Sequence, residues 1–175
     1  KLQKVEQITL TPKDVKEQSV LFAQYDAKQV YYMQYSCREQ DKFDVKSSPV
    51  ANLYNSYFSG GMNSIVFQEM REARGLAYSA NARYAVPSKS GDTYSFTTFI
   101  ATQNDKMMDA VNAFDEIVNQ MPQSEAAFNI AKENIIANLR TNRVKGMGVI
   151  NYWLNLQKRG LTEDPNKELF DKVQQ

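Results

Sequence analysis

Residues 59–85 read SGGMNSIVFQEMREARGLAYSANARYA, and this stretch decides the fold predicted for the chain. Between its glycine pair and Gly75, apolar residues recur at steps of three and four, which predicts an amphipathic helix lying on another layer. Gly75 follows a basic last turn at Arg74 and is expected to end that helix. The predicted apolar stripe consists of Met62, Ile65, Val66, Met70 and Ala73.

The residues after Gly75 change from a helical period to a period of two, which is typical of a β-strand. The larger side chains fall on one face of this strand, which carries Leu76, Tyr78, Ala80, Ala82 and Tyr84. A helix and a strand that meet at one glycine form a tight corner. Arg71 and Tyr78 are therefore predicted to flank this corner.

The flanking sequence predicts further strands on both sides of the corner. Two β-rich runs, 20–25 and 30–35, bracket a turn and predict a hairpin, and helical spacing follows over 49–58. Residues 93–101 form a strand predicted to pair antiparallel with the corner strand across the loop 87–92.

Amphipathic helices make up the last third of the chain. We expect one helix over 105–120, a second that begins after the capping residue Ser124, a third that ends at Arg159, and a last one over 166–174. Antiparallel strands combined with separate helices predict an α+β fold.

Length and composition favour one domain. The chain has 175 residues, of which 1–18 are predicted to be a leading segment or linker and 19–175 a single α+β domain. Because the first residue is Lys1, we expect an excised or processed piece of a longer polypeptide. The compartment, cytoplasmic or periplasmic, is left open.

The charge balance and hydropathy predict no nucleic-acid partner and no membrane span. Twenty-one basic and twenty acidic residues give a net charge of +1, and the charges are interspersed. No apolar run approaches the roughly 20 residues that a membrane span requires. A soluble protein is therefore expected.

The sequence contains no histidine. This excludes Ser-His and Cys-His catalytic pairs, histidine general bases and every histidine-containing metal site from the chain.

Two sets of features together resemble one half of a peptidase of the pitrilysin/insulinase family: the order of elements, and the motif QEMREARGLAYS at residues 68–79. The resemblance implies a two-layer sandwich in which helices cover one face of a largely antiparallel sheet. It also implies a zinc-dependent endopeptidase built from two homologous halves that enclose a peptide. The chain stops at Gln175 without the further strand that such halves have, so we expect the sheet to lack its last strand.

The missing histidines assign the chain to the noncatalytic half, because the family's zinc motif is His-x-x-Glu-His. The resemblance thus implies no metal ligand, no cofactor and no catalytic residue in this chain, which alone is expected to be inactive. Zinc is implied in the catalytic half, which is the expected partner along with the peptide substrate. Arg71 and Tyr78 match an arginine and tyrosine of the noncatalytic half, which implies that they bind substrate and assist the transition state.

Two alternatives stay open. Arg71 is also consistent with a helix-surface cation and Tyr78 with an aromatic residue at the sheet edge. At the level of the whole protein, the alternative to a peptidase half is a catalytically inert scaffold or assembly subunit with the same fold.

Overall fold

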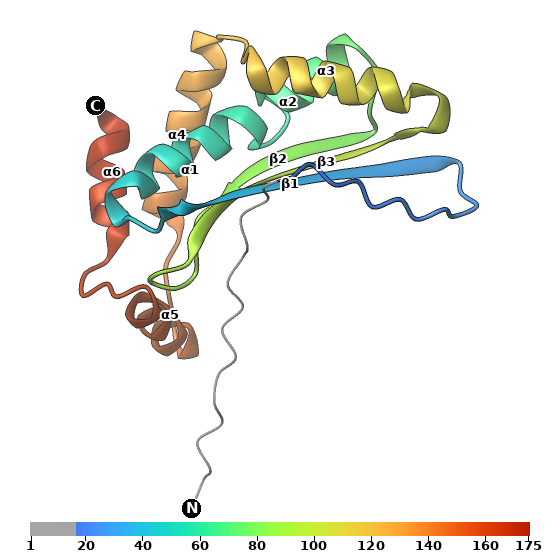
Figure 1. Ribbon diagram of the computed structural model, residues 1–175. Coiled ribbons are helices and arrows are strands. Elements are labelled where there is room, and N and C mark those ends of the chain that lie inside the picture. The colour runs from blue at the N-terminus through green and yellow to red at the C-terminus, as the bar shows by residue number, and fades with distance from the viewer. Residues whose placement is uncertain (1–16) are drawn as a thin grey trace, which may run out of the picture.

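A computed structural model describes residues 17–175, which form one sheet with most of the helices on one of its faces (Figure 1). The strands are β1 (Gln29–Lys42), β2 (Ser79–Ala85) and β3 (Thr93–Gln103). The main helices are α1 (Ser48–Ser59), α3 (Met107–Asn119), α4 (Glu125–Thr141), α5 (Met147–Lys158) and α6 (Pro165–Gln174). Shorter helical pieces are η1 (Val45–Ser47), α2 (Ile65–Phe67), η2 (Gln68–Ala73) and η3 (Asn104–Lys106).

The sheet is antiparallel throughout, in the order β1-β3-β2. β2 and β3 form the predicted hairpin, with Ser79 opposite Ala101 and Ala85 opposite Ser95. β1 pairs with the other side of β3, with Gln29 opposite Gln103. The predicted α+β class, the antiparallel sheet and its single helical layer are therefore confirmed.

The core lies between the sheet and the helices, as the alternation along β3 predicts. Even-numbered side chains of β3 point into this layer, and Thr98 and Ile100 are fully buried. The opposite face carries Tyr31, whose ring stacks on Phe99 at a centroid distance of 5.8 Å. The largest fully buried side chains are Phe58, Val66, Met70, Ile100, Phe114 and Ile117.

The predicted first strand of the N-terminal hairpin is wrong. Residues 20–25 form no strand, and Val20, Leu21, Phe22 and Tyr25 are almost fully exposed. A strand becomes stable when it buries one face against another layer. Within residues 17–175, the sheet face away from the helices has no second layer, so β-propensity alone does not order this run. The proposed domain start at residue 19 stays a prediction, and residues 1–16 lie outside the described part.

Helix α1 also closes the outer edge of β2 with its side chains. The Asn55 side chain donates to the Tyr84 carbonyl and accepts from the Tyr84 N–H, both at 2.8 Å. The Ser59 hydroxyl accepts from the Ala82 N–H at 3.0 Å. These bonds take the place of a neighbouring strand.

Replacing Asn55 by alanine should lower the free energy of unfolding by about 2 kcal/mol, because two part-buried backbone groups of Tyr84 lose their partner. Urea unfolding of the variant measures the loss. The control is Asn52→Ala, since Asn52 lies on the same helix and bonds only to the exposed Ser48 carbonyl. Equal losses in the two variants would show that the bonds to β2 add nothing to stability.

Candidate functional site

The corner between helix and strand is built differently from the α-helix that periodicity predicts. The helix begins at Ile65 rather than Met62, and residues Gln68–Ala73 form a π-helical turn. Its wider ring is closed by the Arg74 N–H, which donates to the Glu69 carbonyl at 3.2 Å. A π-helical turn contains one residue more than an α-helical turn, which changes the direction in which the later side chains point. Ala73 is therefore exposed, whereas Met70 remains fully buried. Turns of this kind occur frequently at functional sites.

Gly75 ends the helix as predicted. Its φ of +57° is the left-handed conformation that favours glycine. The Met70 carbonyl then accepts from the N–H groups of Leu76 and Ala77, at 2.9 and 3.3 Å. The chain is thereby turned directly into β2.

Arg71 and Tyr78 meet across this corner. The centre of the Arg71 guanidinium lies 5.5 Å from the centroid of the Tyr78 ring and 5.2 Å from that of Phe67. These are cation–π distances. The Arg71 side chain is 50% exposed, so N–H groups of its guanidinium are accessible to a ligand. The carboxylate of Glu72 comes only within 3.9 Å.

The backbone of Tyr78 is hydrogen-bonded, whereas its side chain is exposed. Its N–H donates to the Ala101 carbonyl at 3.0 Å, which extends the β2–β3 pairing by one residue. The side chain has a relative exposure of 74%. The strand proper begins at Ser79, so Tyr78 stands at the corner, directly before the strand. The phenol is free to face a second body.

Arg74 fixes the corner to the helical layer. Its guanidinium donates to the Glu116 carboxylate of α3 at 2.8 Å and lies 3.6 Å from Glu69. The hydrogen bond to Glu116 raises the pKa of Arg74, and the same bond lowers the pKa of Glu116. Arg74 is exposed, so this is a surface ion pair that ties the end of the turn to α3.

A hollow of about 170 Å³ lies beside the corner, between the turn and the ends of β1 and β3. Lys106 borders it and donates to the Gly75 carbonyl at 3.4 Å. The Thr102 hydroxyl of β3 donates to the Leu76 carbonyl and so ties the turn to this strand. The hollow is lined by Gln29, Gly75, Leu76, Ala77, Tyr78, Thr102, Gln103 and Lys106.

Phe67 and four of the lining residues, Gln29, Thr102, Gln103 and Lys106, are not among the residues that the sequence predicts at this corner. Phe67 stands four residues before Arg71, a spacing that brings side chains together on a helix and therefore signals the contact. The lining residues come from three segments that are distant in sequence, and no local pattern connects them.

The residues present do not fit a zinc ion. The sequence has no histidine, and within residues 17–175 no three Cys, Asp or Glu side chains are grouped closely enough to hold a metal. Every helix in this described range is too short or too polar to cross a lipid bilayer.

Comparison with solved structures supports the fold. A crystal structure of a peptidase M16 inactive domain from Pseudomonas fluorescens is similar over 86% of this chain, with a TM-score of 0.64 and 14% identity. A conserved protein from Enterococcus faecalis is similar over 83%, with a TM-score of 0.57 and 13% identity. The chain spans only 36% and 33% of these two structures.

Comparison at the sequence level identifies the family. No curated protein matches the sequence. The family model described as the peptidase M16 inactive domain matches residues 2–135, which is most of the chain. The chain therefore belongs to the peptidase M16 inactive-domain family.

Proposed function

We propose that this chain is the noncatalytic half of a zinc-dependent endopeptidase, and that it encloses and orients a peptide for a separate zinc-bearing half. The observation that carries the proposal is the exposed pair of Arg71 and Tyr78 at the corner, where the guanidinium carbon lies 5.5 Å from the centroid of the phenol ring. Family membership supports pairing with a catalytic half. In this proposal, cleavage of the peptide bond belongs to that half, because the chain has no histidine and its described residues, 17–175, group no three Cys, Asp or Glu side chains closely enough for a metal.

The proposed role of the pair is to hold the backbone of the peptide. The Arg71 guanidinium has several N–H donors in a planar fork, which suits a carbonyl or carboxylate oxygen. The Tyr78 phenol adds one donor beside it. The rings of Phe67 and Tyr78 keep the guanidinium in place, so the donors are oriented before the peptide arrives.

Rigid support distinguishes this pair from ordinary surface residues. The π-helical turn, the left-handed Gly75 and the Arg74–Glu116 bond all fix the backbone between the two side chains. A preorganised donor is more effective than a mobile one, since less ordering is required when the substrate binds.

In the assembled enzyme, Tyr78→Phe should lower kcat/KM about tenfold, because one hydrogen bond to a developing charge is lost while the ring over Arg71 remains. A fluorogenic peptide assay measures the change, and metal analysis should give an unaltered zinc content. The control is Tyr25→Phe, since Tyr25 is an exposed phenol in the segment before β1.

Unchanged kinetics for Tyr78→Phe would show that Tyr78 is only an aromatic residue at the sheet edge and that its hydroxyl does not assist the reaction. An assembly that cleaves no peptide and has no zinc in either half would instead support a scaffold function.

A further inference from the structure

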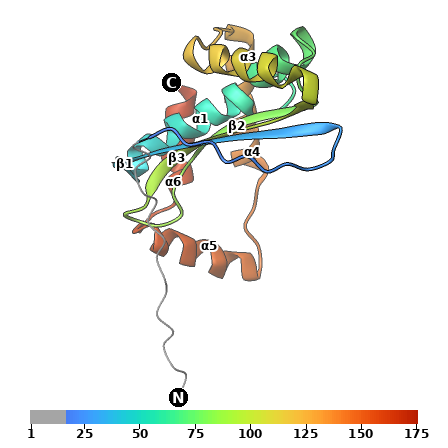
Figure 2. The same ribbon diagram turned by 45° about the vertical axis from the view of Figure 1, so that its right-hand side comes forward.

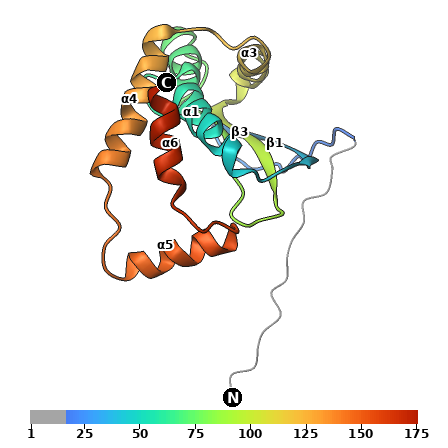
Figure 3. The ribbon, with the colours of Figure 1, turned by 90° about the vertical axis from the view of Figure 1, so that its left-hand side faces the viewer.

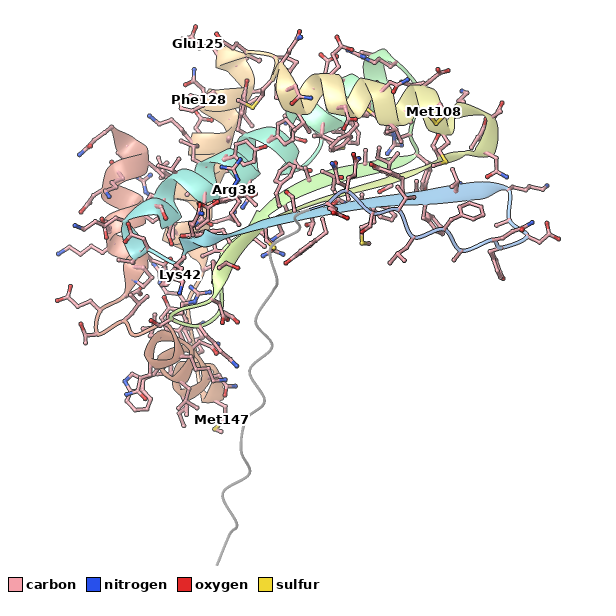
Figure 4. All side chains as sticks on the ribbon, viewed as in Figure 1. Arg38, Lys42, Met108, Glu125, Phe128 and Met147 are labelled. Carbon is pink, nitrogen blue, oxygen red and sulfur yellow. The ribbon has the colours of Figure 1, made fainter. Side chains whose placement is uncertain are left out.

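Helix α5 lies apart from the rest of the helical layer (Figures 2 and 3). None of its residues is buried. The hydrogen bonds that hold it are at its middle and its end: the Tyr152 hydroxyl donates to the Asp164 carboxylate at 2.7 Å and accepts from the Asn166 side chain at 2.9 Å, and the Lys158 carbonyl accepts from the Ser90 N–H at 2.9 Å. Its first residue, Met147, points away from the sheet (Figure 4). A helix of twelve residues is only marginally stable in water without a packed face.

The composition of α5 is that of a helix covered on most sides. Of its polar residues, Asn151, Asn155 and Lys158 repeat at steps of four and three and so form one narrow stripe, while Gln157 lies off this stripe. The rest of the circumference is largely apolar. Side chains with exposures between 42% and 74% include Met147, Val149, Ile150, Trp153 and Leu154. Clustered exposed apolar side chains mark interaction sites.

The charges around α5 depart from the even balance of the whole chain. Residues 141–162 contain four cations and no acidic residue, and Glu163 and Asp164 follow them. The cations stand at the two ends of the helix, and only Lys158 lies on its polar stripe. They are Arg143, Lys145, Lys158 and Arg159.

This arrangement matches a protein interface better than a lipid-binding helix. A helix that lies on a membrane carries its cations along the polar face. In α5 the apolar centre is instead flanked by cations at its two ends, as the core of a protein interface is surrounded by a polar rim. Trp, Met and Arg, all present here, are enriched in such interfaces.

We propose that the apolar face of α5 is a docking surface for the catalytic half, and that it receives an apolar patch bordered by carboxylates. This rests on the proposed function, which supplies the catalytic half as partner. The rim cations provide charge complementarity and steer the encounter, while the apolar centre supplies most of the affinity.

The occupant of α5 can be identified in the intact assembly by photo-cross-linking. Trp153 is the only tryptophan of the chain and lies at the middle of the exposed face, so Trp153→p-benzoylphenylalanine places the probe there. We expect cross-links to the catalytic half, mapped by mass spectrometry to a segment rich in Asp and Glu. The control carries the same probe at Val50, an apolar position on α1 that is even more exposed than Trp153.

A second variant checks that the contact depends on the apolar face. Ile150→Asn in the probe-bearing protein should abolish the cross-link to the catalytic half, whereas Asn151→Ala, on the polar stripe, should leave it in place. Cross-links to a second copy, to another segment of this half or to anionic lipid would overturn the proposal, and so would the absence of any cross-link.

The two proposals fail separately. An assembly that loses activity on Tyr78→Phe but gives no cross-link from position 153 keeps the proposed function and refutes docking through α5. Cross-links to the catalytic half with unchanged Tyr78→Phe kinetics give the opposite result.

Discussion

Replacing Arg71 by alanine should lower kcat/KM of the assembled peptidase about 100-fold, the magnitude typical for loss of one preorganised donor to a developing oxyanion. The guanidinium is fixed over two rings, so its donors need no reorganisation when negative charge grows on the carbonyl oxygen of the peptide. We expect most of the loss in kcat. Steady-state kinetics with a fluorogenic peptide gives both constants, and metal analysis should show unchanged zinc.

Two further variants define what Arg71 contributes. Arg71→Lys keeps the charge but lacks the planar fork, so it should recover only part of the activity. Arg140→Ala is the matched control, because Arg140 also lies over an aromatic ring, at 5.6 Å from that of Phe170, but on α4 far along the chain. If Arg71→Ala and Arg140→Ala have the same kinetics as the wild type, Arg71 is a helix-surface cation.

Replacing Phe58 by alanine should lower the free energy of unfolding by about 3–5 kcal/mol. Phe58 is fully buried at the end of α1, and its ring stacks on Tyr54 at 5.2 Å. The truncation removes apolar contact from the centre of the core and leaves a cavity against the sheet. Urea unfolding followed by circular dichroism measures the loss.

Phe22→Ala is the control for the core substitution, since Phe22 is exposed and should change stability by less than about 0.5 kcal/mol. Should Phe58→Ala unfold the chain entirely, Phe58→Leu still tests the argument, because it keeps most of the volume and should cost about 1 kcal/mol. Equal effects for Phe58→Ala and Phe22→Ala would contradict the described core.

The sequence predicts the fold well where one residue decides a local conformation or one face is buried. Gly75 takes the left-handed conformation, the Ser124 hydroxyl accepts from the Ala127 N–H at the start of α4, and the even positions of β3 face the core. These features depend on neighbours in sequence, so periodicity and capping rules capture them.

The sequence fails where the outcome depends on distant partners. Val20 to Tyr25 have high β-propensity, yet no layer is present among the described residues to cover them. A search for apolar residues at a period of 3.6 does not detect the π-helical turn, because Met70 fits the α-helical and the π-helical spacing alike. At the corner, the position of Arg71 beside Tyr78 was predicted from the tight turn, whereas the support from Phe67 was not. The role of this pair stays a prediction.

The side chains of α1 make the two edges of the sheet unequal in their ability to accept a further strand. Asn55 and Ser59 occupy three backbone groups on the outer side of β2, those of Tyr84 and the Ala82 N–H. Among the strands of residues 17–175, β1, with fourteen residues, pairs with β3 alone. An added strand would therefore compete with side chains of α1 along β2 but not along β1. The same asymmetry protects the β2 side from edge-to-edge aggregation, and it directs any misassembly of this half toward β1.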